Sequence, residues 1–117
     1  MKSNRATIIK AIDDKKGKDI VEIDFAENNG SICDAYIICS ATSNSHTDAI
    51  SNEIDKQMRE IHKEKPIRMG GKEDGLWIIL DYGDVMVHIF EEQTRKVYAL
   101  ERLWSGAKIT NHRSSED

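Results

Sequence analysis

The sequence predicts a single domain of the α/β class, in which a mixed β-sheet is packed with helices. Its 117 residues are enough for one hydrophobic core and too few for two. Segments with the apolar spacing of helices alternate along the chain with short apolar runs that are typical of strands. The predicted order is helix, strand, strand, helix, short strand, strand, strand, helix, and this order favours a mixed sheet with helices packed on it.

The chain begins with a predicted amphipathic helix over 4–16, whose apolar side chains share one stripe: Ile8, Ile9, Ala11 and Ile12. Gly17 then supplies a C-terminal signal. Residues 19–25 alternate apolar and acidic side chains, which is the period of a half-buried strand. Residues 34–41 form a short apolar run after a turn, and its length favours a buried central strand over a helix.

A second helix is predicted over about 46–63, because apolar residues recur at steps of three and four: Ile50, Ile54, Met58 and Ile61. Ser45 followed by Asp48 is a variant of the capping box, with Asp in the place of Glu or Gln. Pro66 and the segment "GGKEDG" (70–75) end this helix, with a brief strand at 67–69.

The last predicted helix covers 91–104. Acidic residues begin it, Gly106 follows it, and apolar residues recur within it: Val97, Leu100, Leu103 and Trp104. We therefore expect one domain over 1–107 and a polar C-terminal tail over 108–117.

Before that helix, the segment "WIILDYGDVMVHIF" (77–90) predicts a β-hairpin. Gly83 suits a two-residue loop between Asp81 and Asp84, and this loop would pair Trp77 with His88. One face of the hairpin is then aliphatic and belongs to the core: Ile78, Leu80, Val85, Val87 and Ile89. The other face mixes aromatic, apolar and charged side chains, as the centres and edges of protein interfaces do: Trp77, Ile79, Asp81, Asp84, Met86 and His88.

The mixed face of the hairpin has two interpretations on sequence grounds. It is a docking surface for another macromolecule, or the helix over 91–104 folds back over it. In the second case Trp77 is an ordinary packing residue and His88 bonds a backbone carbonyl.

Composition argues against several classes of protein. The net charge of −4 gives no global basic field for nucleic acid, so any contact with RNA would be local. The chain has no apolar run long enough to cross a membrane and no signal peptide, so we expect a cytosolic protein. Cys33 and Cys39 would lie about 20 Å apart along a strand, too far for a disulfide, and we expect both to be core residues.

Catalytic sites find little support in the sequence. His88 lies about 13 Å from Asp84 along the predicted strand, which leaves His46 as its one attractive partner. His46, His62 and His112 are otherwise expected to be structural. The segment "GSICDAY" (30–36) faintly resembles the nucleotidyltransferase strand that carries two metal-binding carboxylates, but a tyrosine takes the second position. We therefore expect no catalytic residue, metal or cofactor.

Three segments together resemble the ribosomal silencing factor family, also called the Iojap-like family: "DAYIICSATSNSHTDAI" (34–50), "GLWIILDYGDVMVHIF" (75–90) and "RKVYALERLW" (95–104). They span most of residues 34–104, and their combined pattern is specific. One departure is Ser45, since members commonly carry Arg or a similar residue before the histidine that matches His46.

The resemblance implies a non-enzymatic protein with an α/β mixed sheet, similar to nucleotidyltransferases without their active site. Members of the family bind the large ribosomal subunit through its protein fourteen, block its joining with the small subunit, and repress translation when nutrients are scarce. Homodimers are associated with the family. RNA contact is then expected to be incidental, and no membrane partner is expected.

From the hairpin and the resemblance together, we expect the partner-binding residues to be Trp77, Asp81, Asp84, Met86, His88, Arg95, Tyr98, Glu101 and Trp104. Trp77 and Tyr98 would be desolvated anchors, and the charged residues would set the register. Two alternatives stay open: a metal-dependent enzyme resembling nucleotidyltransferases, and a generic dimeric scaffold that binds another protein through the same face.

Overall fold

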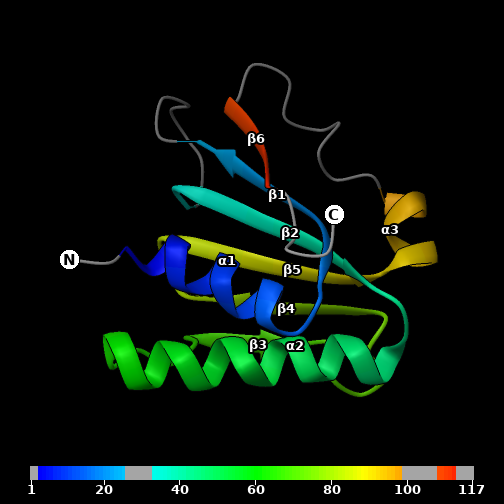
Figure 1. Cartoon of the computed structure of the whole chain (residues 1–117), viewed down its shortest axis with the longest axis horizontal. Coiled ribbons are helices and arrows are strands. Elements are labelled where there is room, and N and C mark those ends of the chain that lie inside the picture. The colour runs from blue at the N-terminus through cyan, green and yellow to red at the C-terminus, as the bar shows by residue number, and fades with distance from the viewer. Residues whose placement is uncertain (1–2, 26–32, 99–107, 113–117) are drawn as a thin grey trace.

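The computed structural model describes residues 3–25, 33–98 and 108–112. Six strands form one sheet in the order β3-β4-β5-β2-β1-β6 (Figure 1). Along the chain the elements are α1 (Asn4–Asp14), β1 (Lys18–Asp24), β2 (Ala35–Ala41), α2 (Asn44–Gln57), the π-helical turn η1 (Met58–His62), β3 (Arg68–Gly70), β4 (Trp77–Asp81), β5 (Val85–Glu91), α3 (Glu92–Tyr98) and β6 (Lys108–His112). The predicted fold class, a single domain with a mixed sheet and packed helices, is confirmed.

The centre of the sheet is a parallel pair formed by β2 and β5, in which Ile38 lies beside His88. The other neighbouring strands are antiparallel. Since parallel strands need a long connection, the chain passes from β2 through α2 and the β3–β4 pair before it returns as β5. This route places two segments that are far apart in sequence at the middle of the sheet.

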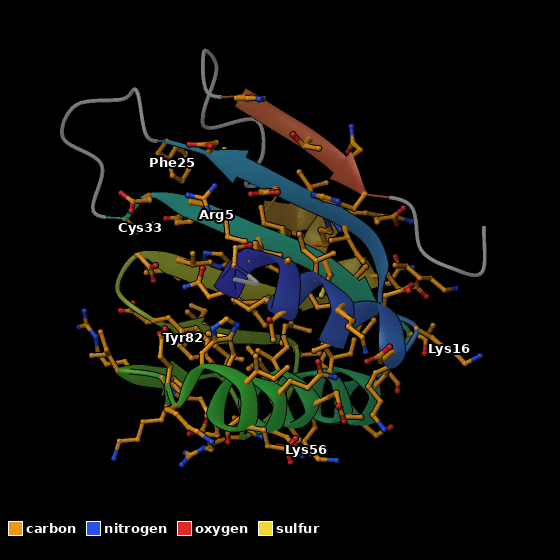
Figure 2. The ribbon with its side chains drawn as sticks, turned by 60° about the vertical axis from the view of Figure 1, so that its left-hand side comes forward. Arg5, Lys16, Phe25, Cys33, Lys56 and Tyr82 are labelled. Atoms are coloured by element: carbon orange, nitrogen blue, oxygen red, sulfur yellow. The ribbon has the colours of Figure 1, made fainter. Side chains whose placement is uncertain are left out.

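Helices α1 and α2 cover one face of the sheet, and the main core lies between them and the strands (Figure 1). The core joins apolar residues of both helices to alternate residues of the strands: Ile8, Ile12, Ile50, Ile54, Ile37, Leu80 and Val87. At its margin, Arg5 of α1 reaches toward β1 and donates to Glu22 and Asp24, at 3.1 and 3.3 Å (Figure 2). Cys33 and Cys39 are buried and not joined to each other, as predicted.

The start of α2 differs from the predicted capping box. Its N-cap is Ser43, whose Oγ accepts a hydrogen bond from the His46 backbone N–H at 3.2 Å. The prediction of Ser45 was wrong because Ser43 already has the extended backbone that an N-cap needs, whereas Ser45 lies inside the first turn. The far end of α2 continues as η1, which stops at Lys63 in the left-handed conformation.

The hairpin has the predicted faces but a register that differs by two residues. Trp77 pairs with Phe90, and His88 pairs with Ile79 rather than with Trp77. The loop consists of Gly83 and Asp84, and Gly83 has a φ of 90°, which suits the first loop position of a type II′ turn. Because side chains alternate with a period of two, a shift by two leaves the strand residues on their predicted faces. Asp84 is the exception, because it lies in the loop and its side chain accepts a hydrogen bond from Asn4 of α1.

Strand β6 was not predicted, because its residues were expected to belong to a polar tail. It pairs with β1 in antiparallel register, with Ile109 beside Ile23. His112 Nε2 also lies 3.1 Å from Glu22 of β1. The strand is exposed at most positions and has no strong apolar pattern, so its pairing with β1 is what makes it a strand. The proposed boundary between domain and tail stays a prediction.

The core between α2 and the sheet supplies a stability test. Ile54 is fully buried, so Ile54→Ala leaves a cavity and should lower the free energy of unfolding by about 2–5 kcal/mol. Val97 on α3 is 78% exposed, and Val97→Ala should change it by less than about 0.5 kcal/mol. Urea denaturation of both variants checks this expectation. Equal losses in the two would show that α2 is not packed as described.

Candidate functional site

The face of the sheet opposite α1 and α2 carries the candidate site. We call it the open face and define it by Tyr36, Ile38, Trp77, Ile79, Met86, His88 and Phe90. Ile38, His88 and Phe90 are buried, whereas Tyr36, Trp77, Ile79 and Met86 are half-buried. A second apolar cluster forms here with Val21, Ile23 and Phe25 of the β1 segment. The open face is therefore packed against the second apolar cluster, and its half-buried residues keep some aromatic and apolar area exposed.

His88 orients Trp77 through a side-chain hydrogen bond. The Trp77 Nε1–H donates to His88 Nδ1 at 3.0 Å. Because an indole nitrogen can only donate, Nδ1 must be unprotonated, and the neutral ring carries its hydrogen on Nε2. Burial lowers the pKa of His88 from 6.5 to about 4, so the ring is neutral at physiological pH. This is a positioning role, which the sequence left undecided against direct contact with a partner.

Aromatic rings extend this arrangement across three strands. The Trp77 ring stacks on Phe90, with centroids 4.9 Å apart, and the Tyr36 ring lies 4.5 Å from the His88 ring. Phe25 meets Tyr36 edge-on at 5.0 Å. Such contacts each contribute about 0.5–1.5 kcal/mol beyond burial. The rings therefore hold one another in place.

Neither Phe90 nor Tyr36 was among the predicted partner-binding residues. The alternation that assigned Met86 and His88 to the mixed face also assigns Phe90 to it, so the signal was present. Tyr36 is different, because it reaches the site only through the pairing of β2 with β5. No local pattern reveals that contact.

The two carboxylates of the hairpin have different surroundings. Asp81 is buried, and its Oδ1 accepts the Gly83 N–H at 2.8 Å while Arg68 lies 3.4 Å from its Oδ2. Asp84 is exposed, and its Oδ2 accepts from the Asn4 side chain at 3.0 Å. Asp81 therefore shapes the turn, whereas Asp84 presents charge at the surface.

The residues expected on the last helix are only partly described. Arg95 is buried, and its Nη1 donates to the Asp19 carbonyl at 2.6 Å and to Ser40 Oγ at 2.9 Å, which ties α3 to β1 and β2. Tyr98 ends α3, but its side chain lies outside the described part of the structure. Glu101 and Trp104 lie outside the described residues altogether, as does the predicted helix beyond residue 98. The interpretation in which that helix folds back over the open face stays a prediction.

The other histidines form hydrogen bonds within the fold. His46 Nδ1 accepts from the Thr42 N–H at 3.0 Å, so its Nε2 donates to the Lys15 carbonyl at 2.6 Å. This ring joins the end of α1 to the start of α2. His62 Nε2 lies 2.7 Å from Thr7 Oγ1. The structural interpretation of these two side chains is confirmed.

The described residues lack the features of a metal site and of a membrane-spanning helix. Across 3–25, 33–98 and 108–112, no group of three His, Cys, Asp or Glu side chains is placed to hold a metal ion. Asp34 is exposed at the start of β2. In the same part of the chain, no helix is long and apolar enough to span a bilayer.

Comparison with known proteins gives consistent matches. A family model described as "Ribosomal silencing factor during starvation" matches residues 1–117. A Bacillus subtilis protein named ribosomal silencing factor RsfS is 34% identical over 112 residues, which cover 92% of this chain and 93% of that protein. A Mus musculus protein named mitochondrial assembly of ribosomal large subunit protein 1 is 28% identical over 74 residues, which cover 62% of this chain and 32% of that protein.

A solved structure matches the fold as well as the sequence. The crystal structure of a Chromobacterium violaceum protein superposes with a TM-score of 0.82 at 30% identity. The match covers 97% of this chain and 93% of that one. The fold is therefore shared over nearly the whole length of both chains.

The lowered pKa of His88 predicts a pH-dependent stability. The unfolded chain binds a proton at His88 near pH 6.5 and the folded chain only near pH 4, so stability should fall as pH drops between these values. Protonation of His88 should lower the free energy of unfolding by about 3 kcal/mol over this range. Above pH 6.5 we expect no change in stability from this residue. Urea denaturation of wild type and His88→Gln from neutral pH to about pH 4 measures the contribution of His88 to the pH dependence of stability. Equal pH dependence in both proteins would contradict the assignment.

Proposed function

The chain belongs to the ribosomal silencing factor family, and we propose that it silences ribosomes by occupying the large subunit. In this proposal it binds the subunit through its protein fourteen, blocks joining with the small subunit, and so represses translation when nutrients are scarce. The role is non-enzymatic. The name of the mouse relative, which concerns assembly of the large ribosomal subunit, supports the choice of that subunit.

The single observation that carries the proposal is the braced aromatic surface of the open face. Trp77 and Met86 are half-buried in the free chain, so each keeps area that a partner can cover. Tryptophan is among the commonest anchors of protein interfaces. Because His88 and Phe90 already orient the indole, little conformational freedom is lost when it docks.

The expected binding residues divide into those that present surface and those that support it. Trp77, Met86 and Asp84 present surface, whereas Asp81, His88 and Arg95 are buried and use polar atoms inside the protein. We propose that the first three touch the partner and that the others hold the scaffold. Contacts by Tyr98, Glu101 and Trp104 stay predictions, as do the homodimer and the cytosolic location.

The aromatic surface of the open face suits a protein that blocks another surface better than it suits an enzyme. A factor that blocks subunit joining needs a rigid adhesive surface and no reactive group. His88 has the environment of a structural ring, because it is neutral and its neighbours are Trp77, Tyr36 and Phe90. The position that should hold a second metal-binding carboxylate after Asp34 is occupied by the Tyr36 side chain.

Truncating the anchor tests the proposal. Trp77→Ala should weaken binding to purified large ribosomal subunits by roughly tenfold or more, because a central aromatic anchor contributes about 2 kcal/mol or more. Cosedimentation over a range of protein concentrations measures this change. The same variant should fail to prevent subunit joining, as followed by light scattering.

Leu76→Ala is the matched control. Leu76 lies just before β4 and is 43% exposed, but it is not one of the residues of the open face. This variant should bind and block joining as wild type does. Normal joining in the presence of saturating wild-type protein would refute the proposed function, and equal behaviour of the two variants would refute the assigned face.

A further inference from the structure

The edge of the sheet beside the open face carries a group of exposed cations. Lys63, Lys65 and Ile67 are exposed at alternating positions of an extended segment, while the residues between them are half-buried. Arg68 follows as the first residue of β3, and its side chain is 82% exposed. We call Lys63, Lys65 and Arg68 the cationic edge.

The side chains of the cationic edge are less closely paired with carboxylates than the cations on either side of it. Arg59, one turn earlier, is paired with Asp55 at 2.8 Å, and Lys72 beyond β3 is paired with Asp48 at 2.9 Å. In contrast, Lys63 donates to the Glu60 backbone carbonyl at 3.2 Å, and it has no ion pair with a carboxylate within the described residues. Arg68 has a long contact of 3.4 Å with Asp81.

The backbone at Lys63 adds an independent observation. Lys63 ends η1 with a φ of 57°, a left-handed conformation in which glycine or asparagine is favoured. A lysine at this position therefore costs the fold some stability. The side chain that it places in solvent has no role in packing that would offset this cost.

The cationic edge is continuous with the open face. Strand β3 borders β4 (Figure 1). Arg68 pairs with Asp81, which lies two residues beyond Ile79 of the open face. Lys56, in contrast, points outward from α2 on the helical side of the molecule (Figure 2). A partner that covers Trp77 and extends past β4 would next meet Arg68 of β3, which the two lysines precede in the chain.

We propose that the cationic edge contacts the phosphate backbone of ribosomal RNA while the open face binds its ribosomal protein. This inference rests on the proposed function. A phosphate backbone offers regularly spaced anions whatever its sequence, so it suits exposed cations such as Lys63 and Lys65. Arg68 keeps its long contact with Asp81, but its side chain is 82% exposed. The whole chain has a net charge of −4, so attraction to RNA must arise from a local group of this kind.

The salt dependence of binding separates the two contacts. The probes are purified large ribosomal subunits and isolated ribosomal protein fourteen, each titrated with wild type over a series of KCl concentrations. The test variant is Lys63→Asn, Lys65→Gln and Arg68→Gln combined, in which asparagine also relieves the left-handed backbone. The control is Lys10→Gln, Lys15→Gln and Lys18→Gln, which removes equal charge from α1 and the start of β1.

For large subunits, the slope of log affinity against log salt should become less negative by roughly 2–3 in the test variant, and it should not change in the control. Affinity for the isolated protein should be the same in all three chains. Unchanged salt dependence on subunits would overturn the inference and leave the proposed function standing. Equal loss on the isolated protein would overturn it in favour of a protein contact, and failure of wild type to bind either probe would overturn both.

Discussion

In the middle of the sheet, β2 and β5 pair in parallel from Ala35 beside Val85 to Ala41 beside Glu91. Both faces of this pair are occupied, since Ile37 and Val87 enter the main core and Ile38 and His88 enter the open face. The helices need the first face for their apolar stripes, and the aromatic rings need the second for support. Any change that separated these two strands would therefore disrupt the packing of the core and of the candidate site together.

The same pairing explains how a histidine can be buried within the candidate site. His88 forms one hydrogen bond with Trp77, and its Nε2–H has no hydrogen-bond partner among the described residues. An unsatisfied buried donor costs about 1–3 kcal/mol, so the protein gives up stability at this position. In return the indole ring is held in one orientation on a flat sheet. Loss of stability at a binding site is common where geometry matters more than packing.

Exposed charges of opposite sign lie on different parts of the protein surface. Asp84 is exposed in the hairpin turn, where it accepts a hydrogen bond from Asn4 of α1. The segment before β4 presents exposed lysine and arginine side chains. One rigid sheet thus offers an apolar centre, an acidic end and a basic edge. This variety suits the composite target of protein and RNA that we propose.

Local pattern determined the elements and their faces: the helices, the strands and the alternation along 77–90 follow from spacing in the sequence, and a register error of two residues did not alter the faces. The resemblance in three segments also identified the family. Tertiary structure alone decided that Tyr36 joins Trp77 and His88, that Arg95 turns inward, and that residues 108–112 form a strand. Those contacts join residues distant in the chain, and periodicity within one segment carries no information about which other segment will lie beside it.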